Sequence, residues 1–537
     1  MLWSAWADAL GWISELTSAE NLHRRTKGRP LTEPFAWQRQ IGGRNGVRVD
    51  LPAGCYSDDT QLRLATARAI SRHGFDVEAF ARVELPVWLS YALGGGRSTK
   101  AAAASMNRQN ANWSTNFYKG WEQAGGNGAA MRIQPHVFAE PNPLSFAQLD
   151  DVVRNSVVTH GHPNAIVGAV LHATVLSIAL AEERVPQPAD WSDILDVTSS
   201  AIESFRRLPE LAAYWKPRWE EASNESFEIA WERTIGSAQQ AFQETHEIFK
   251  ELQASASDRS ATLRYYDELV RLLELDQGST RGSGLLTAVA STLLAAAFPQ
   301  HPADAARLAA SRLDTDTDTI ATMAAAIVAA ANPAKLVSPV LDAEYITSEA
   351  DRLTNIALER PADMFPYPDL LHWTAPKSAM DSVGIADGHL ALAGLGWVEP
   401  FGVEYSSRGG MWRWMTVSFG PTMLLKFRNE PPTFERSNWP NTSRVWVNND
   451  PMRAFRANEE SQEELSVVEP IAYSSVPDSE IRVTDSSMEL DVIFRWLEQK
   501  QYSDSSVGYA LRRILERGSA AQLSRFIAEI TQIVRFP

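Results

Sequence analysis

The sequence predicts a mainly α-helical protein, with an all-helical body in the first 335 residues and a β-rich α+β appendage after it. The alanine-rich run Ile320–Ala331 has apolar residues at helical spacing and ends before a proline, which indicates a buried helix. Gly282–Ala297 is a second Leu/Ala-rich run of this kind. The composition then changes, because residues 362–450 carry six of the 18 tryptophans. They also contain two β-type runs around Ser406–Gly410, which predicts a hairpin.

Length, charge and cysteine content narrow the functional classes. A chain of 537 residues with 44% hydrophobic residues is expected to form two or three domains with a large core. The formal net charge of −16 argues against nonspecific binding to nucleic acid or to an anionic membrane. The one cysteine, Cys55, excludes an internal disulfide and fits a reducing compartment. No signal-peptide pattern is present and the longest apolar stretch, Leu285–Phe298, is too short to span a membrane, so we expect a cytoplasmic protein.

Composition divides the chain into four segments. Residues 1–335 form the predicted helical body, which includes a charged helical insertion at about 182–277. A Trp-rich, β-containing domain is predicted for 336–456 and an acidic, Ser-rich linker for 457–488. Residues 489–537 read as a C-terminal helical element of two amphipathic helices, for which docking is the expected role.

An acidic turn just before the helix Ile320–Ala331 is the first candidate site. In Asp314-Thr315-Asp316-Thr317-Asp318-Thr319, three carboxylates alternate with three hydroxyls. A helix N-terminus needs one Asp or Thr as a cap. The helix dipole favours about one further negative charge there. Three carboxylates in five residues repel one another, and a hard divalent cation prefers oxygen ligands of this kind. The turn therefore predicts a metal site.

A second acidic turn, Ser57-Asp58-Asp59, opens another predicted helix far upstream. Two acidic helix N-termini suggest one shared metal site. Together the two turns resemble the ADP-ribosylglycohydrolase family, whose hallmark is a Thr/Ser-Asp-Asp turn paired with a late Asp-x-Asp-Thr turn that together hold two Mg²⁺ ions. The resemblance implies two Mg²⁺ ions here, with Mn²⁺ as an alternative. The implied ligands are Ser57, Asp58, Asp59, Asp316, Asp318 and Thr319.

The N-terminal helix carries the same resemblance. Asp8, Gly11 and Glu15 follow the family's opening pattern, although Ala7 replaces its usual first glycine. The resemblance implies that Glu15 approaches the metal site from a mobile segment and that Glu15 or Asp58 acts as general base. The plain alternative for Glu15 is a surface glutamate at a helix end.

A glycine-rich loop gives the third signature. Gly126-Asn127-Gly128 leads into Met131-Arg132, and free N–H groups in such a loop can meet a phosphate or a ribose. The resemblance implies ADP-ribose contacts at Gly126, Asn127, Gly128, Met131 and His160. His160 and His162 could suggest zinc, but no third nitrogen or sulfur ligand lies nearby, so His162 is expected to cap a helix or pack.

One departure concerns the substrate. The family usually has two glycines directly before its late acidic turn, and this chain has Asp314-Thr315. The added carboxylate would either bring another metal ligand or narrow the cleft. A separate loop, Gly94-Gly95-Gly96, would permit close approach of the backbone to a ligand.

These observations lead to the expectation of a Mg²⁺-dependent hydrolase that cleaves the glycosidic bond between ADP-ribose and an acceptor. Its partner would be an ADP-ribosylated macromolecule or small molecule. The alternatives are a non-catalytic ADP-ribose-binding protein and a metal-dependent hydrolase of another nucleotide or glycoside. Nucleic-acid binding by the C-terminal third is a further alternative that no motif supports, because aromatic residues interleaved with basic ones can also fill a core. The basic residues concerned are Arg413, Lys426, Arg428 and Arg444.

Overall fold

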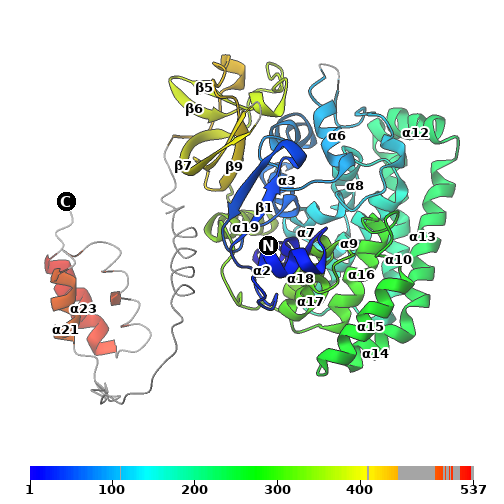
Figure 1. Cartoon of the computed structure of the whole chain (residues 1–537), viewed down its shortest axis with the longest axis horizontal. Coiled ribbons are helices and arrows are strands. Elements are labelled where there is room, and N and C mark those ends of the chain that lie inside the picture. The colour runs from blue at the N-terminus through cyan, green and yellow to red at the C-terminus, as the bar shows by residue number, and fades with distance from the viewer. Residues whose placement is uncertain are drawn as a thin grey trace. The chain divides into compact units, whose positions relative to one another are not determined.

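The structure is a computed structural model that describes residues 1–108, 111–407, 410–444, 490–499 and 520–533, together with residues 502, 507, 510, 511 and 514. It divides into two compact units, Met1–Ser466 and Val467–Pro537. The first unit combines a large helical body with a five-stranded antiparallel sheet (Figure 1), so the predicted mainly helical class with a β-rich addition is confirmed. The predicted linker 457–488 lies outside the described residues.

The helices of the first unit are as follows. They are α1 (Leu2–Ser14), α2 (Ala19–Thr26), α3 (Asp58–Arg68), α4 (Val77–Ala79), α5 (Leu85–Trp88), α6 (Arg97–Ser105), α7 (Gln134–Phe138), α8 (Leu149–Val157), α9 (Pro163–Glu182), α10 (Trp191–Ser200), α11 (Ser204–Arg207), α12 (Lys216–Ser223), α13 (Phe227–Glu244), α14 (His246–Ala254), α15 (Arg259–Leu272), α16 (Gly284–Ala297), α17 (Pro302–Ala310), α18 (Thr317–Ala331) and α19 (Ala343–Ala357).

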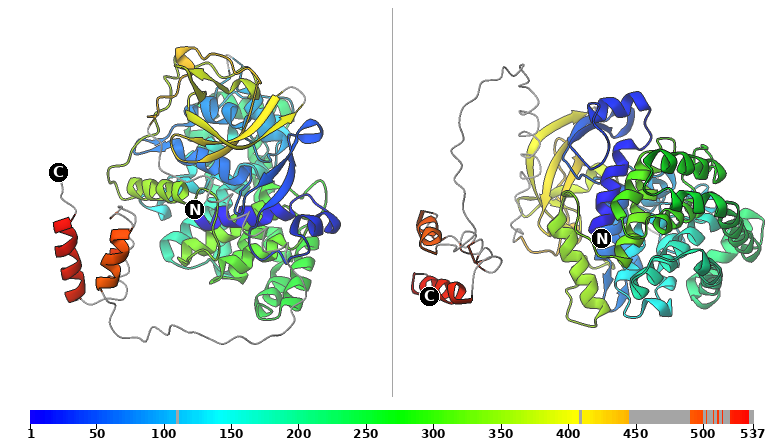
Figure 2. Two further views of the ribbon diagram at one scale, coloured as in Figure 1. Left: turned by 60° about the vertical axis from the view of Figure 1, so that its left-hand side comes forward. Right: turned by 90° about the horizontal axis from the view of Figure 1, so that it is seen from below.

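Four apolar helices form the centre of the helical body. α18 packs against α1, α16 and α9, and the dark-blue N-terminal helix lies against green helices of the body in Figure 2. Almost every side chain of α16 and α18 is buried. Their alanines and glycines let the backbones approach closely, while leucine, isoleucine and valine fill the remaining space. α10 to α15 occupy the predicted insertion and pack on this centre through Trp191, Trp215, Trp219 and Trp231, which are buried. α9 is the described helix with the length and composition of a membrane span, and 78% of that window is buried inside the protein, as in a core helix.

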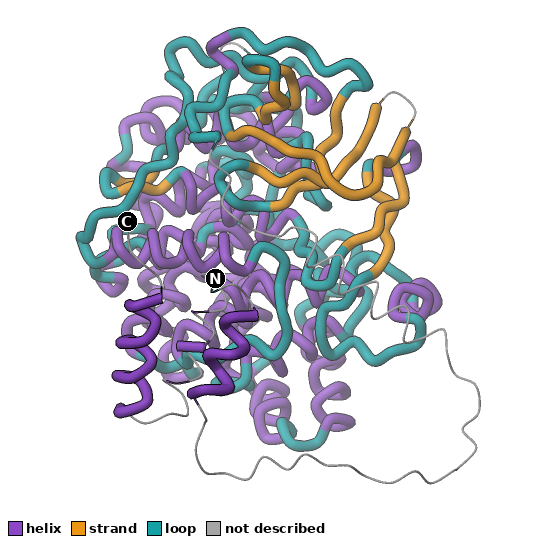
Figure 3. Tube along the Cα trace, turned by 90° about the vertical axis from the view of Figure 1, so that its left-hand side faces the viewer, coloured by secondary structure: helices purple, strands orange, loops and turns teal. Residues whose placement is uncertain are grey.

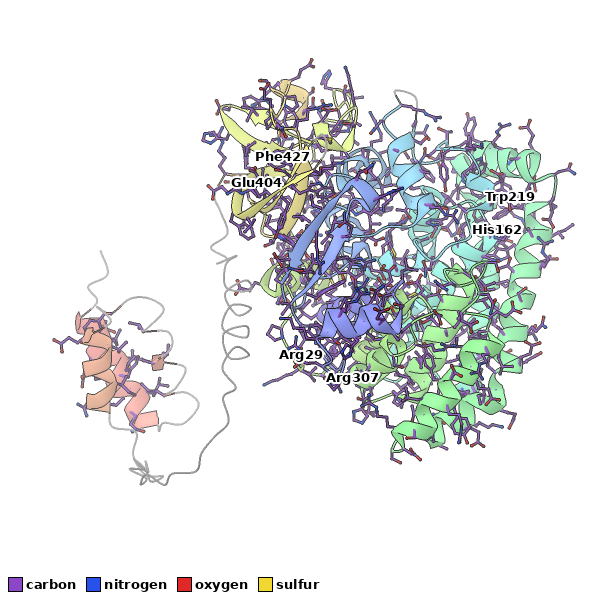
Figure 4. All side chains as sticks on the ribbon, in the orientation of Figure 1. Arg29, His162, Trp219, Arg307, Glu404 and Phe427 are labelled. Carbon is purple, nitrogen blue, oxygen red and sulfur yellow. The ribbon has the colours of Figure 1, made fainter. Side chains whose placement is uncertain are left out.

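The segment 16–53 contains an element that the sequence analysis treated as a connection. Strands β1 (Trp37–Ile41) and β2 (Val47–Leu51) form an antiparallel hairpin, with Trp37 opposite Leu51 and Ile41 opposite Val47. Their alternating burial places Trp37, Val49 and Leu51 against α1 and its neighbours, and polar side chains on the other face. Arg307 of α17, labelled in Figure 4, holds the preceding segment by donating from Nε to the carbonyl oxygen of Thr32 at 2.8 Å.

The C-terminal sheet has strand order β5-β6-β7-β8-β9, and each neighbouring pair is antiparallel (Figure 3). The strands are β5 (Val383–Ala386), β6 (His389–Leu392), β7 (Gly396–Ser407), β8 (Gly410–Val417) and β9 (Thr422–Phe427). β7 and β8 are the predicted hairpin, and their register shifts between Phe401 and Glu404. Two-residue strands β3 (Ile70–Ser71) and β4 (Gly74–Phe75) make a separate short ladder.

The sheet shares its hydrophobic core with the helices. Met415 and Leu425 belong to the same cluster of buried side chains as the helices of the body, and Trp414 packs with Trp37 of the hairpin. A buried ion pair, Arg68 of α3 with Glu84, lies at this junction. The predicted boundary after residue 335 therefore falls inside one compact unit.

The second unit is small. α21 (Leu490–Gln499) and α23 (Ala520–Ile533) correspond to the two predicted amphipathic helices, and Phe494 stacks on Phe526 with ring centroids 5.5 Å apart. Leu490, Leu497 and Phe526 are buried in its core. The docking role of this element stays a prediction.

Candidate functional site

The early acidic turn is held in place by Asp8 of α1. Ser57 caps α3 by accepting a 3.2 Å hydrogen bond from the N–H of Asp59. The carboxylate of Asp8 accepts 2.9 Å bonds from the N–H groups of Ser57 and Thr60, and a 2.6 Å bond from the Thr60 hydroxyl. Both oxygens of Asp8 are therefore engaged with the turn. We assign Asp8 a positioning role. The side chains of Asp58 and Asp59 take no part in these hydrogen bonds with Asp8.

The late acidic turn meets the same helix. α18 begins at Thr317, with Asp316 as its N-cap, and the Thr317 hydroxyl donates to the carbonyl oxygen of Gly11 at 2.8 Å. Gly11 is required by this contact, because a Cβ there would lie 2.5 Å from the Cα of Asp318. One helix thus fixes both acidic helix N-termini, which explains how turns more than 250 residues apart converge.

The two turns face one cavity of about 970 Å³. Eleven of the twelve residues predicted for the site line it, and Ser57 lies behind the wall as the helix cap. The lining members are Glu15, Asp58, Asp59, Gly126, Asn127, Gly128, Met131, His160, Asp316, Asp318 and Thr319. Segments far apart in the sequence therefore meet at one cavity, and their function as a site and the role of each residue stay predictions.

Burial and mutual repulsion perturb these carboxyl groups. Desolvation, followed by the charges of Glu15 and Asp8, raises the pKa of Asp58 to about 7. Desolvation and the neighbouring carboxylates also raise the pKa of Asp59 and of Asp318 well above the usual range. Like charges in a desolvated cluster disfavour ionisation, and a cation among them would restore it.

The donor chemistry of the cluster suits a hard cation. Oδ2 of Asp59 is buried without a hydrogen-bond partner among the described residues, and such an orphaned oxygen calls for a ligand. The same part of the chain contains no group of three or more His, Cys, Asp or Glu side chains arranged to hold a metal as they stand. The case for a bound cation therefore rests on the oxygen atoms available and on their negative charge. Binding requires the carboxylate side chains to move closer together around the ion. Carboxylates and hydroxyls are the ligands that Mg²⁺ and Mn²⁺ accept.

The Gly126–Gly128 loop is tied to the late turn. The Asn127 side chain donates to Oδ2 of Asp316 at 2.9 Å and to the Thr287 hydroxyl at 3.2 Å. The backbone N–H of Asn127 donates to the carbonyl oxygen of Gly282 at 2.9 Å, so this N–H is not free for a ligand as the sequence suggested. Arg132 clamps the loop from behind by donating to the carbonyl oxygen of Gly128 at 2.6 Å. The loop is a rigid wall of the cavity.

His160 is a neutral ring beside this loop. The Thr159 hydroxyl accepts from Arg132 at 2.8 Å and shares a hydrogen bond with Nδ1 of His160, 2.7 Å away. Burial and the charge of Arg132 lower the pKa of His160 to about 3. Nδ1 is engaged with Thr159, and Nε2 has no hydrogen-bond partner among the described residues. His162 instead caps α9 by accepting from the N–H of Asn164 at 3.1 Å, which confirms the capping interpretation (Figure 4).

Glu15 is held by an arginine that the sequence analysis missed. Arg39 of β1 donates from Nη2 to Oε2 of Glu15 at 2.8 Å, and its guanidinium lies 5.0 Å from the Trp12 ring centroid. Both side chains of the ion pair are less than a fifth exposed. Desolvation is the largest influence on Glu15 and raises its pKa, while Arg39 acts in the opposite direction. Glu15 is therefore a largely covered carboxyl group that Arg39 orients, and not a free surface glutamate.

The loop Gly94-Gly95-Gly96 between α5 and α6 also lines the cavity, next to Asp58. A side chain at Gly94, whose φ is +129°, would collide with Oδ1 of Asp58, so the backbone approaches the site as predicted. Arg97 and Lys100 of α6 also line the cavity. Neither was predicted, since a short helix after a loop gives no local sign of what it faces.

The carboxylate added at Asp314 has neither of the two expected effects. Asp314 does not line the cavity, its side chain is 64% exposed, and it lies 3.6 Å from Arg312. Thr315 lines the cavity and donates to the Arg312 carbonyl oxygen at 2.8 Å, closing the turn. The additional carboxylate therefore faces solvent beside Arg312. Of the three carboxylates in this turn, Asp316 and Asp318 face the cavity.

The fold and the two acidic turns define a hydrolase of the ADP-ribosylglycohydrolase type. The model of that family, described as ADP-ribosylglycohydrolase, matches residues 1–362, two thirds of the chain, and the chain belongs to this family. A solved structure titled "ADP-ribosylglycohydrolase-related protein complex" is similar at 18% identity, covering 57% of this chain and 83% of that one with a TM-score of 0.35. No curated protein sequence matches significantly.

Proposed function

We propose that the protein removes ADP-ribose from an acceptor by hydrolysing the glycosidic bond at C1″ of the distal ribose, with Mg²⁺ or Mn²⁺ bound at the two acidic turns. One observation carries the proposal. Buried, mutually repelling carboxylates from two helix N-termini share the cavity with the Asn127 loop, and Oδ2 of Asp59 has no partner among the described residues. A binding pocket for an uncharged sugar alone would not need this cluster.

The residues divide the work by their positions. Asp58, Asp59, Asp316, Asp318 and Thr319 supply oxygens at the cavity wall, and Ser57 supports them as the cap of α3. Divalent cations on these oxygens would polarise the ribose and acidify a bound water. Glu15, oriented by Arg39, would accept the proton of the attacking water. Asn127 holds Asp316 in its rotamer through the 2.9 Å hydrogen bond.

The remaining lining residues would bind the ADP-ribose. His160 lies beside the Gly126–Gly128 loop with Nε2 unengaged among the described residues, so this neutral ring can form a hydrogen bond with a ribose or phosphate group. Met131 adds apolar lining behind the loop. Because His160 is neutral at every pH above about 4, its contact would not depend on the pH of the assay.

The test is release of ADP-ribose from a panel of conjugates with arginine, serine and nucleic-acid acceptors, with Mg²⁺ and with EDTA. The proposal predicts release from at least one conjugate with Mg²⁺ and none with EDTA. Calorimetry with free ADP-ribose runs beside it. Binding of ADP-ribose without release from any conjugate would replace the proposal with the binding-protein alternative. Failure to bind ADP-ribose, with hydrolysis of another glycoside, would replace it with a different hydrolase.

A further inference from the structure

A second cavity of about 880 Å³ lies between the hairpin β1-β2, the end of α2 and strand β7. Five basic side chains line it, and one carboxylate, Asp50, is the single acidic residue in the lining. The basic members are Arg24, Arg25, Lys27, Arg39 and Arg48. We call this surface the basic groove. Its positive charge contrasts with a formal net charge of −16 for the chain, so it is a local feature that the overall composition conceals.

The cations of the groove are weakly neutralised. The side chains of Lys27 and Arg48 are exposed and have no hydrogen-bond or ion-pair partner in the part of the chain that the structure describes. Arg24 pairs with Glu20 at 3.3 Å, but both side chains are more than two thirds exposed, so water weakens that pair. Asp50 already accepts from Gln38 at 2.6 Å and from the Tyr405 hydroxyl at 3.3 Å. An anion in the groove would meet these cations with little competition.

The groove adjoins the candidate active site. Arg39 lines both cavities, with its guanidinium against Glu15 on one side. Arg25 also lines the groove and donates to the carbonyl oxygens of Ile13 and Glu15 at 2.6 and 3.3 Å. A substrate whose ADP-ribose occupies the first cavity can therefore extend its acceptor past Arg39 along the groove.

The walls of the groove favour a polyanion over an extended peptide. Among the described residues, β6 pairs with β7 only at Gly396 and Trp397; further along β7, Pro400 lacks an N–H and the register with β8 shifts between Phe401 and Glu404. Addition of a peptide strand is therefore disfavoured. Four of the five cations are arginines, whose planar forks fit phosphate oxygens. The volume suits a few nucleotides of one strand.

We propose that the basic groove binds the phosphate backbone of a single-stranded nucleic acid, and that a nucleic acid is the ADP-ribosylated acceptor presented to the neighbouring cavity. This inference rests on the proposed function for its second half. It differs from the alternative raised by the sequence, because the basic residues of the sheet serve the protein itself. Arg428 pairs with Asp381, Arg444 pairs with Asp387, and Lys426 lies over the Trp412 ring.

The experiment measures fluorescence anisotropy of a 5′-labelled 12-nucleotide oligothymidylate with the full-length protein between 0.05 and 0.2 M NaCl. Four groove cations outside the active site predict a slope of log K against log salt of about −3 for a single strand. The variant Lys27→Gln/Arg48→Gln removes two of them, so its slope should be shallower by about 1.4 and its affinity several-fold lower. The matched control Arg259→Gln/Arg264→Gln, on exposed positions of α15 that line neither cavity, should bind like the unmodified protein.

Three results would overturn the proposal. These are absence of oligonucleotide binding, equal weakening by the α15 control, and tighter binding of a labelled 12-residue polyglutamate, which would make the partner an acidic protein.

A kinetic experiment separates this inference from the proposed function. The Lys27→Gln/Arg48→Gln variant should release ADP-ribose from a small conjugate at the normal rate and from an oligonucleotide conjugate several-fold more slowly. Absence of release from every conjugate would overturn the proposed function alone, because the anisotropy does not depend on turnover.

Discussion

The side-chain amide of Asn127 donates a hydrogen bond of 2.9 Å to Oδ2 of Asp316, and this bond joins the glycine-rich loop to the late acidic turn. The loop and the turn are 189 positions apart in the sequence, and each would be unremarkable alone. Through this bond, the segment proposed to contact ADP-ribose also orients a carboxylate proposed to bind metal. Substrate binding and metal binding should therefore respond together to changes at either residue.

We expect Asn127→Asp to reduce kcat/KM more than Asn127→Ala does. The aspartate loses the donated bond and places a second carboxylate against Asp316, while alanine only removes the bond. Loss of a hydrogen bond to a charged group costs about 1.5–3 kcal/mol, or roughly a tenfold to hundredfold loss of activity. Steady-state release of ADP-ribose at several Mg²⁺ concentrations measures this. Equal effects of the two variants would show that Asn127 does not position Asp316.

Arg39 should act through Glu15. Arg39→Ala frees the carboxyl group from its orientation, and Arg39→Lys keeps the charge but loses the fork and the stacking on Trp12. We expect kcat to fall in both variants, less in the lysine variant, with KM for a small conjugate nearly unchanged. In a double-mutant cycle, adding Arg39→Ala to Glu15→Gln should cost little more than Glu15→Gln alone. If the losses in kcat caused by the two substitutions are additive, Arg39 does not act through Glu15.

The buried ion pair between Arg68 and Glu84 should dominate the stability of the junction with the sheet. Arg68 donates two 2.8 Å bonds to Glu84, the Tyr367 hydroxyl donates to Glu84 at 2.7 Å, and Phe419 packs against the guanidinium. Glu84→Gln leaves a buried cation uncompensated, so we expect a loss of about 3–5 kcal/mol of unfolding free energy. Urea denaturation measures it. The exposed pair supplies the control, because Glu20→Gln should change stability by less than about 1 kcal/mol.

The same junction bears on the predicted boundary after residue 335. Truncation there removes Tyr367 and Phe419 from Arg68, and it removes Trp373, whose Nε1 donates to the carbonyl oxygen of Arg82 at 2.7 Å. It also uncovers apolar surface on the hairpin that Trp414 covers. We therefore expect the fragment 1–335 to be insoluble or to unfold several degrees lower than a fragment ending at residue 444. A soluble, cooperatively folded fragment 1–335 would contradict this and restore the independent domain.

Asp342 should make stability depend on pH. It accepts bonds from the Tyr56 hydroxyl at 2.7 Å and from the N–H of Thr422, and burial raises its pKa from 3.8 to about 6. The folded state therefore holds this proton more tightly than the unfolded chain, so its contribution to stability falls as pH rises from about 4 to 6. Asp342→Asn, which keeps the left-handed backbone conformation acceptable, should remove that fall and add about 1–3 kcal/mol at pH 7. Identical pH profiles for both proteins would contradict it.

Local signals in the sequence predicted the centre of the site but not its periphery. The acidic turns could be found because each sits directly at the start of an apolar helix, and α18 begins only three residues before the predicted Ile320. Arg39 could not be found, because its contact with Glu15 depends on how the hairpin packs on α1. The hairpin itself had a usable signal in the alternating residues on both sides of a glycine-rich turn.

The basic groove shows a second limit of sequence reasoning. Its cations come from α2, β1 and β2, and part of its wall comes from β7, so no single window of sequence contains it. The sheet, by contrast, offered basic residues among aromatics within one window, and several of those cations are engaged inside the protein. Proximity in sequence therefore indicated cations that have partners within the protein. The exposure of Asp314 was equally hidden from the sequence, because it depends on the position of this turn relative to Arg312 and the cavity.

The most direct test of the central claim is calorimetric titration of the metal-free protein with MgCl₂, comparing Asp59→Asn, Asp318→Asn and Asp314→Asn. The account predicts that the first two variants lose most of the Mg²⁺ binding, because each removes one buried carboxylate from the shared cluster. Both should also melt at a higher temperature without metal, since a repelling charge is gone. Asp314→Asn, the same change on the exposed side of the turn, should bind Mg²⁺ normally. Normal Mg²⁺ binding by both Asp59→Asn and Asp318→Asn would contradict a metal site shared by the two turns.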